Sequence, residues 1–368
     1  MKILFDHQAF TIQRYGGISR YFFELLSRFD SHENYELSCL FSNNEYLKDN
    51  RLSNQRYFFN NISFKGKERI INFLNEKRSL YNINRHNYDI FHPTYYSNYF
   101  LNNTFHKPFV ITCYDMIHEK FSDKFIELKN DKVLIKNKEI LLRNASKIIA
   151  ISECTKKDII DFYNIESSKI EVIYLGSNLK LETNPNQFLI PNFDYLLFVG
   201  NRGLYKNFIK LINSIRELLI NFNIKMICAG GGSFNNLEKE FINNLELNKH
   251  LIYLPILNDS YLSNLYNNSK FFIFPSLYEG FGIPILEAFA CKTPVLASKA
   301  GSLFEIGDIA ADYFDPYDDQ SIYTATKSLI FDTNRRNELI SLGYERLNLF
   351  SFDKTYHQTL GVYKSLLY

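Results

Sequence analysis

Two glutamates, Glu279 and Glu287, lie eight residues apart around a glycine-rich turn in FPSLYEGFGIPILEAF, residues 274–289. The glycines permit a tight turn with little side-chain bulk, and Pro284 suits the first position of a helix. Glu287 is then expected in the first helical turn, where it either complements the helix dipole or binds a ligand. A small-residue loop beside a helix N-terminus suits an anion, and two flanking carboxylates suit sugar hydroxyls.

Two cations, Arg202 and Lys206, follow a strand-like apolar run in FVGNRGLYKNF, residues 198–208. In chains that alternate strands and helices, ligands bind just beyond the carboxyl ends of the strands. A cationic pair in that place can neutralise a diphosphate, with the guanidinium supplying two parallel hydrogen bonds. The alternative is a pair of ordinary surface charges, but the position at a strand end favours an anion site.

Two weaker groups of residues also stand beside expected elements. Gly16 and Gly17 precede a helical pattern, where their amides either form an anion-binding nest or only make a turn. Tyr114, Asp115 and His118 stand just past an apolar run, where a base or a hydroxyl-binding group is useful. A structural role, in which Asp115 caps the next helix, is an equal alternative.

The elements that must position these residues are short β-rich runs that alternate with longer helical patterns. The expected strands are 2–6, 36–41, 88–92, 109–113, 147–152, 169–174, 195–200, 225–230, 250–255, 270–276, 294–298 and 312–315. Continuous apolar strands separated by helices indicate parallel sheets covered on both faces. Twelve strands exceed one ordinary open sheet, so the sequence predicts an α/β fold with two doubly wound Rossmann-like domains facing a cleft.

A stretch rich in Asn and Pro, residues 177–193, predicts the hinge between these domains. We therefore expect an N-terminal domain at 1–177 and a C-terminal domain at 178–351. Residues 352–368 have a helical pattern, and this helix can pack back across the boundary.

Composition narrows the classes of function. The chain has 368 residues, a formal net charge of +2 and 22% charged residues, which gives no reason to expect nucleic acid as a partner. The five cysteines are scattered without paired spacing, as expected for free thiols in a reducing compartment. No uncharged apolar run reaches the roughly 18 residues of a membrane span, and the first residues lack a secretion signal. We expect a cytoplasmic protein, soluble or peripheral at the inner face of the cell membrane.

One segment, FKGKERIINFLNEKRSLYNINRH at residues 64–86, suggests contact with a membrane surface. It is rich in Lys and Arg, and Ile70, Phe73 and Leu74 have helical spacing. A basic amphipathic helix of this kind can lie on anionic lipid. The alternative is a surface helix packed on its own sheet.

Four stretches, taken together and in order, resemble a family 4 retaining glycosyltransferase with the GT-B fold. The strongest similarity is in SLYEGFGIPILEAFACKTPVLASKAGSLFEI, residues 276–306, which resembles the E-x7-E region of that family. FVGNRGLYKN, YGGISRY and ISECTKKDI resemble three further family segments. The resemblance covers nearly the whole chain, and relatives with YGGISRY commonly build bacterial surface polysaccharides.

The resemblance implies a role for each charged side chain singled out above. Glu279 would be the catalytic carboxylate that faces the transferred sugar, and Glu287 would bind the donor ribose. Arg202 and Lys206 would clamp the donor diphosphate.

The resemblance also implies donor contacts from glycines and main-chain groups. Gly16 and Gly17 would line one side of the cleft, and Phe281, Gly282 and Ile283 would lie at the phosphates on the other. No metal or other cofactor is expected, because cations and helix dipoles stabilise the departing nucleotide in this family. The chain also lacks the Asp-x-Asp pair of metal-dependent transferases.

The implied reaction is transfer of a hexose, with retention, from a nucleotide diphosphate sugar to a lipid-linked or growing glycan. GDP-mannose is the favoured donor and UDP-hexoses are the alternative. Many family members have His-Asp where this chain has Tyr114-Asp115, so their histidine contact is not carried over, and His118 is the candidate substitute. Two other functions stay open: another GT-B enzyme, such as a sugar-nucleotide epimerase, and a non-catalytic nucleotide-sugar binding module.

Overall fold

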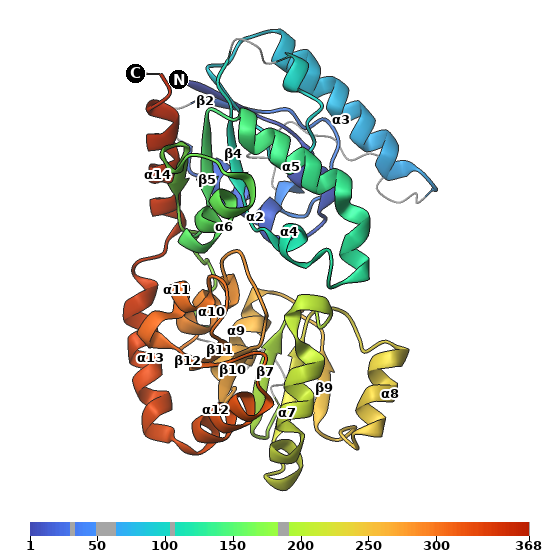
Figure 1. The fold of residues 1–368 in the computed structure, drawn as a ribbon, viewed down its shortest axis with the longest axis vertical. Helices are drawn as coiled ribbons and strands as arrows, with labels where there is room; N and C mark the ends of the chain where they lie inside the picture. The colour runs from blue at the N-terminus through green and yellow to red at the C-terminus, as the bar shows by residue number, and fades with distance from the viewer. Residues whose placement is uncertain (30–33, 49–63, 104–106, 183–190, 368) are drawn as a thin grey trace. The chain divides into compact units, whose positions relative to one another are not determined.

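The computed structural model describes residues 1–29, 34–48, 64–103, 107–182 and 191–367. The chain forms two compact units (Figure 1). The N-terminal unit contains Met1–Leu175 and Phe352–Tyr368, and the C-terminal unit contains Gly176–Ser351. All strand pairs within each unit's described residues are parallel, which confirms the prediction of two doubly wound α/β domains.

Six strands of the described residues belong to the N-terminal unit: β1 (Lys2–Phe5), β2 (Asn34–Leu37), β3 (Ile90–His92), β4 (Val110–Cys113), β5 (Lys147–Ala150) and β6 (Ile170–Val172). They form two three-stranded sheets, ordered β2-β1-β3 and β4-β5-β6. A single parallel bridge between Phe91 and Phe109 joins β3 to the start of β4. The strand order therefore reverses direction beside β1, which is the switch point of a doubly wound sheet.

Seven helices of the described residues belong to the N-terminal unit: α1 (Gln8–Ile12), α2 (Gly17–Leu26), α3 (Lys67–Asn84), α4 (Ile117–Phe121), α5 (Lys132–Asn144), α6 (Glu153–Tyr163) and α14 (Phe352–Lys364). Ser152 caps α6 by accepting the Thr155 amide, and Asn164 ends it in the left-handed conformation. These two signals account for where α6 begins and ends.

In the C-terminal unit, the part that the structure describes forms six strands: β7 (Tyr195–Val199), β8 (Lys225–Ala229), β9 (Leu251–Leu254), β10 (Phe271–Phe274), β11 (Val295–Ser298) and β12 (Asp312–Phe314). They form one sheet in the order β12-β11-β10-β7-β8-β9. The order reverses between β10 and β7. Ligands of such sheets bind outside the carboxyl ends of the strands at this reversal.

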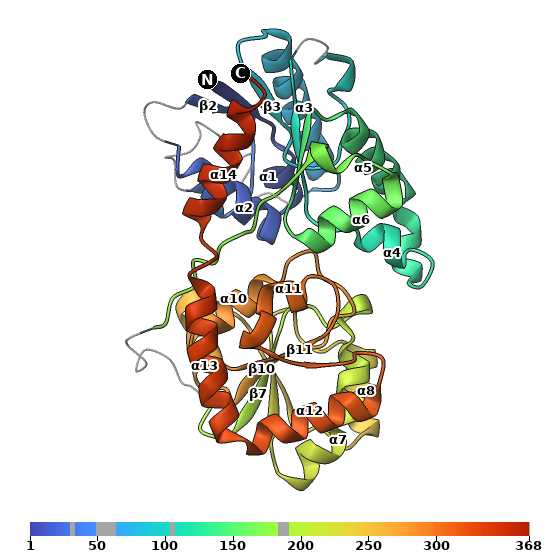
Figure 2. The ribbon, with the colours of Figure 1, turned by 60° about the vertical axis from the view of Figure 1, so that its left-hand side comes forward.

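Helices of the C-terminal unit are α7 (Phe208–Asn221), α8 (Asn236–Asn244), α9 (Asp259–Asn267), α10 (Ile283–Ala290), α11 (Leu303–Gly307), α12 (Asp319–Phe331) and α13 (Thr333–Leu347). Helix α7 packs on α12, while α10 packs on α9 and α13 (Figure 2). Buried Leu196, Met226 and Phe271 of the strands belong to one core with Leu211 and Ile215 of α7. This core fixes the sheet edge at which the loops after β7 and β10 begin.

Strand β2 differs from its expected range. Residues 36–41 were the expected strand, but β2 is Asn34–Leu37. The amides of Leu40 and Phe41 both donate to the Asn75 side-chain oxygen, at 2.9 Å, in place of a neighbouring strand. A distant side chain therefore ends the strand, and local sequence does not reveal it.

The structure shows the state of the five cysteines and the lengths of the described helices. None of the five cysteines forms a disulfide, and Cys154 alone among them is not buried. Burial raises the pKa of the Cys113, Cys228 and Cys291 thiols to about 12, so they stay protonated. Within the described part of the chain, every helix is too short or too polar to cross a bilayer.

Helix α14 returns to the N-terminal unit, as the helical pattern of 352–368 suggested, and packs against α2 (Figure 2). Its Tyr363 hydroxyl lies 2.6 Å from Nδ1 of His92 at the end of β3. Nε2 of His92 lies 3.0 Å from the Thr112 hydroxyl of β4. This buried chain of hydrogen bonds connects α14 to the two central strands.

We expect the stability of the N-terminal unit to fall in acid because of His92. Burial lowers its pKa from 6.5 to about 3, so the folded unit keeps the ring neutral while the unfolded chain protonates it. The contribution of neutral His92 to the free energy of unfolding is complete above pH 6.5. It is lost progressively as the pH falls toward 3, by about 1.4 kcal/mol per pH unit. Between pH 7 and pH 4, the free energy of unfolding measured with urea should fall less steeply in His92→Gln than in the wild type. Parallel curves would contradict this assignment.

Candidate active site

The loops after β7 and β10 meet where the strand order of the C-terminal sheet reverses. Lys206 ends a short 3-10 turn, Leu204–Lys206, after β7, and Glu279 lies in the loop after β10. The Lys206 ammonium is 2.6 Å from Oε1 of Glu279, and both side chains are mostly buried. The Lys206 ammonium also lies over the Phe274 ring, 5.6 Å from its centroid. The structure thus joins two sequence-predicted site residues in one ion pair at the expected ligand-binding edge.

The loop that carries Glu279 is held rigidly by the segment before α11. The Ser302 hydroxyl is fully buried and lies 2.6 Å from the Phe281 carbonyl oxygen and 2.9 Å from that of Glu279. A Cβ on Gly301 would stand 3.0 Å from the Glu279 amide nitrogen. Close packing and a buried hydroxyl therefore fix the backbone of Glu279 before any ligand arrives. Sequence analysis did not identify Ser302, because nothing local shows which carbonyls a serine reaches.

Helix α10 begins one residue earlier than expected, which corrects the position of Glu287. Gly282 is the N-cap with φ 110°, and a Cβ there would meet the Leu303 side chain at 2.8 Å. Ile283 is the first helical residue, so Pro284 is the second and Glu287 the fifth. The expectation that Glu287 stands in the first turn is wrong, because Gly282 is the N-cap in the left-handed conformation and the helix begins at the next residue. The helix dipole acts mainly over the first turn, so it does not explain a carboxylate here.

Glu287 is buried, with 8% of its surface exposed. The hydroxyl of Tyr266 on α9 donates to its Oε2 at 3.1 Å. Burial and then the Glu287 carboxylate raise the pKa of Tyr266 well above its usual range, so this donor stays protonated. The Tyr266 hydroxyl thus helps to fix the position of the Glu287 carboxylate.

Arg202 is placed differently from Lys206. Its guanidinium is buried and pairs with Glu238 at the start of α8, with Nε 2.7 Å from Oε1. It also donates to the carbonyl oxygens of Gly230, at 3.2 Å, and Gly232, at 2.9 Å, and lies over the Phe234 ring. Arg202 therefore holds the loop after β8 through contacts within the protein.

Glu238 was missed by sequence analysis although a signal exists. Asn235 and Glu238 form a capping box, in which each side chain bonds the other residue's amide. Burial acts to raise the pKa of Glu238, but the Arg202 guanidinium and the Asn235 amide hold it below its usual value. The spacing Asn-x-x-Glu before a helical pattern could have shown the cap, but not the arginine.

The loop that Arg202 holds is made of three consecutive glycines, Gly230, Gly231 and Gly232, all with positive φ. A Cβ on Gly231 would lie 2.5 Å from the carbonyl oxygen of Gly200. The loop after β8 is therefore packed directly on the backbone after β7, and only glycine fits there. This contact positions the start of the segment that carries Lys206.

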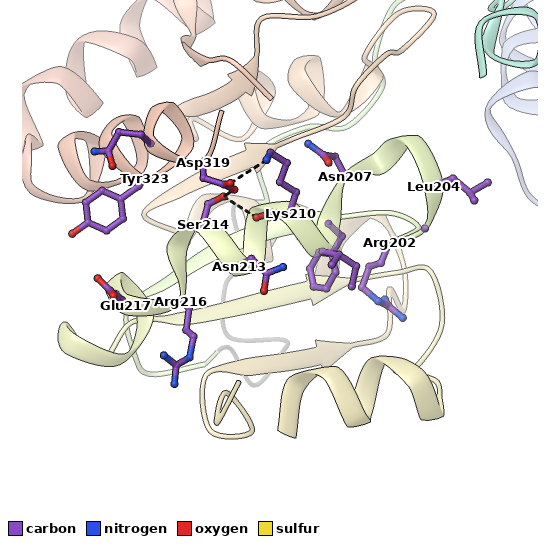
Figure 3. A pocket seen from close by; sticks show the side chains of 14 residues that line it. Arg202, Leu204, Asn207, Lys210, Asn213, Ser214, Arg216, Glu217, Asp319 and Tyr323 are labelled. Carbon is purple, nitrogen blue, oxygen red and sulfur yellow. Dashed lines mark hydrogen bonds and ion pairs between the residues drawn. The ribbon is translucent and has the colours of Figure 1, made fainter. Parts of the chain in front are cut away.

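A cavity of about 1010 Å³ lies along α7, beside α12 (Figure 3). Its lining has mixed charge, and the Lys210 ammonium pairs there with Asp319 at 3.2 Å. Arg202 and Gly203 line one end, but Lys206 and Glu279 are not part of its lining. The ion pair therefore does not line this cavity, although Leu204 and Asn207, close to Lys206 in the chain, do.

In the N-terminal unit, α2 begins at Gly17 with Gly16 as its extended N-cap, so only Gly16 precedes the helix. The Gln13 side-chain oxygen accepts the Ser19 amide at 3.0 Å, and a Cβ on Gly16 would collide with Gln13. One amide at this helix start is thus already bonded within the unit. At Gly17, by contrast, a Cβ would meet nothing within 4 Å.

Tyr114, Asp115 and His118 all follow β4, but each contacts its own unit. The buried Tyr114 hydroxyl donates to the Thr94 carbonyl oxygen at 3.2 Å. Oδ1 of Asp115 accepts the amide of Ile117, the first residue of α4, at 3.0 Å, although the N-cap residue of this helix is Met116. Nε2 of His118 lies 3.2 Å from Asp131.

A buried ion pair beside these residues was not identified from the sequence. The Lys138 ammonium of α5 lies 3.0 Å from Oε2 of Glu119 on α4, and their side chains are 1% and 2% exposed. The Tyr163 hydroxyl donates to the other Glu119 oxygen at 2.7 Å, and Lys138 also donates to the Asp115 carbonyl. All three groups are satisfied within the unit, so this cluster holds α4, α5 and α6 together.

Two family models match consecutive parts of the chain. Residues 15–181 match the model described as Glycosyltransferase Family 4, and residues 181–346 match Glycosyl transferases group 1.

Among curated proteins, the uncharacterized glycosyltransferase MJ1607 of Methanocaldococcus jannaschii is 27% identical over 59% of this chain and 59% of its own length. The O-antigen chain mannosyltransferase RfbU of Salmonella typhimurium is 28% identical over 60% of each chain. The O-antigen chain mannosyltransferase B of Escherichia coli is 26% identical over 72% of this chain and 70% of that protein. The match thus spans only about 60% of the first two relatives.

Solved structures show the same fold at low identity. Sucrose-phosphate synthase from Thermosynechococcus elongatus is 18% identical with a TM-score of 0.77, covering 100% of this chain and 98% of that one. HepE from Anabaena, solved with UDP and glucose, is 18% identical with a TM-score of 0.75 and covers 99% of each chain. The two Rossmann-like units are therefore the two domains of a GT-B fold.

Proposed function

Because the chain belongs to the family 4 glycosyltransferases, with a group 1 domain after the family 4 domain, we propose that it moves a hexose from a nucleotide diphosphate sugar to a glycan. Transfer proceeds with retention at the anomeric carbon. The acceptor is a lipid-linked or growing chain in the synthesis of a bacterial surface polysaccharide. Mannose is the favoured sugar, because several curated relatives are named mannosyltransferases.

The observation that carries this proposal is the ion pair between Lys206 and Glu279 at the strand reversal. Without donor, each charge neutralises the other. A bound diphosphate would draw the ammonium to its own negative charge, since anions bind at this edge. Glu279 would then stand beside the sugar with an unpaired carboxylate, where it can stabilise positive charge developing at the anomeric carbon.

The remaining donor contacts follow from the same geometry. The first amides of α10, at Gly282 and Ile283, precede the internal hydrogen bonds of the helix and suit the phosphates. Glu287, one turn further on, would accept hydrogen bonds from the ribose hydroxyls. Lys206 and the helix dipole would stabilise the leaving nucleotide, so we propose that no divalent metal is required. Arg202 would act by holding the loop after β8 in place.

Two other functions would use the same nucleotide-sugar donor. A sugar-nucleotide epimerase with this fold would convert the donor without any acceptor. A non-catalytic module would bind the donor and leave it unchanged. Both are distinguished from a transferase by the products formed in the presence of acceptor glycan.

The test starts from ligand binding. We expect GDP-mannose to raise the melting temperature more than UDP-glucose, UDP-galactose or UDP alone, because a ligand stabilises the folded state by RT ln(1 + [L]/Kd). The selected donor is then incubated with lipid-linked acceptor extract in EDTA. Labelled sugar should enter the glycan fraction and nucleoside diphosphate should accumulate. An altered sugar nucleotide without transfer would support the epimerase, and activity that returns only with Mn²⁺ would refute the metal-free proposal.

A further inference from the structure

Helix α3 packs on the N-terminal unit through an unusually polar face. Asn75, Ser79 and Asn82 are buried, at helical spacing, together with Ile71 and Ile83. The Asn75 amide nitrogen donates to the Phe41 carbonyl at 2.7 Å, and Asn82 donates to Glu36 at 2.6 Å. Specific hydrogen bonds to β2 and to the segment after it therefore hold this helix, with only a small apolar contribution.

The opposite face of α3 carries the large apolar side chains. Ile70, Phe73 and Tyr81 are 42%, 57% and 55% exposed, and with Lys77 they recur at intervals of three and four residues. Residues at this spacing form one stripe along a helix. Figure 1 shows α3 at the periphery of the N-terminal unit. An amphipathic helix normally buries such a stripe, and here the stripe faces outward.

Basic side chains border this stripe along its length. Residues 64–86 contain two acidic side chains, Glu68 and Glu76, and six basic ones: Lys65, Lys67, Arg69, Lys77, Arg78 and Arg85. The segment therefore carries +4, whereas the whole chain carries +2, so all other residues together sum to −2. The Lys77 ammonium lies over the Phe73 ring at 5.4 Å, and the guanidinium groups of Arg78 and Arg85 lie over Tyr81 at 5.6 and 5.9 Å.

We propose that this stripe of α3 docks on an anionic membrane surface, with the helix axis parallel to the bilayer. Phe73, Ile70 and Tyr81 would enter the headgroup region, and the bordering cations would meet lipid phosphates. Charge selects this occupant over a second copy of the chain, since a symmetric contact would place +4 against +4. The proposal does not depend on the transfer reaction, and it would hold for any acceptor.

The test is flotation with phosphatidylcholine vesicles that contain or lack phosphatidylglycerol. We expect the whole protein to float with the anionic vesicles and to remain below with the neutral ones. F73S/Y81S and K77E/R78E should each reduce the anionic partition by at least about tenfold, because each basic residue and each buried ring contributes several-fold to binding. Added salt should weaken wild-type binding, since charge contributes to it.

The matched control is K132E/K136E, which makes the same charge change on two exposed lysines of α5 in the same unit. It should float like the wild type, and circular dichroism should confirm that all variants are folded. Equal flotation with neutral vesicles, or full flotation of K77E/R78E, would overturn the proposal. A concentration-dependent dimer that is lost in F73S/Y81S would also overturn it, because the stripe would then be a contact between copies.

Discussion

Glu279→Gln is expected to lower kcat by about 10²–10³-fold, as the loss of one preorganised electrostatic group does in other enzymes. The amide keeps the size of the side chain but cannot stabilise positive charge at the anomeric carbon. Nucleotide affinity should survive, because the substitution also releases Lys206 from its ion pair at 2.6 Å. A loss of kcat without a loss of nucleotide affinity is expected only when the interaction is stronger in the transition state than in the ground state.

Steady-state kinetics with the preferred donor, and calorimetric binding of its nucleoside diphosphate, measure the two effects separately. Glu287→Gln is the matched control, since it is the same change eight residues away. It should raise the donor KM with a smaller effect on kcat, because a ribose contact acts in the ground and transition states alike. Near-normal kcat in folded Glu279→Gln would leave only a structural role for this carboxylate.

Lys138→Met is expected to destabilise the N-terminal unit by about 3–5 kcal/mol, the usual cost of leaving one member of a buried ion pair without its partner. Glu119 would keep the Tyr163 hydrogen bond but would be a buried charge without a cation. The double variant E119Q/K138M should recover most of this loss. Its neutral amide still accepts from Tyr163 and requires no counter-charge.

Urea unfolding should be combined with hydrogen exchange of α4, α5 and α6, because a chain of two units need not unfold in one step. Lys132→Met is the control, since Lys132 is exposed on the same helix. It should change the free energy of unfolding by less than about 0.5 kcal/mol. If E119Q/K138M were as unstable as Lys138→Met, the loss would come from packing and not from the unpaired charge.

The fold was predictable because parallel sheets leave a strong local signal. Strands buried on both faces are continuous apolar runs. Eleven of the twelve expected runs contain a strand, and the remaining one, 36–41, overlaps the end of β2. The order of these strands then places the segments after β7 and β10 side by side. Lys206 and Glu279 could therefore be expected near one another without any knowledge of side-chain contacts.

Contacts with partners distant in sequence could not be predicted. Arg202 follows a strand end as expected, but Glu238 and two carbonyl groups of the glycine loop occupy its guanidinium. Tyr114 follows β4, yet its hydroxyl bonds to Thr94 inside the unit. Strand-end position predicts the neighbourhood of a side chain, whereas its direction depends on packing that no short pattern encodes.

The orientation of helix α3 likewise could not be predicted from the sequence. Its apolar residues have helical spacing, and such a stripe usually faces a core. In α3 the buried face instead carries Asn75, whose side chain hydrogen-bonds the backbone of Leu40 and Phe41 in the segment after β2. The sequence shows that the helix has two unlike faces, but not which of them is buried.

The return of α14 to the N-terminal unit has a consequence for the order of synthesis. Tyr363 bonds His92, yet about 270 residues separate them in the chain, including the whole C-terminal unit. On the ribosome, the C-terminal unit is complete before the first unit can close its own core. The C-terminal unit, by contrast, is one continuous stretch of the chain, Gly176–Ser351. A fragment that stops at residue 175 would leave the ring of His92 without its tyrosine, so an isolated N-terminal unit needs residues 352–364 joined to it.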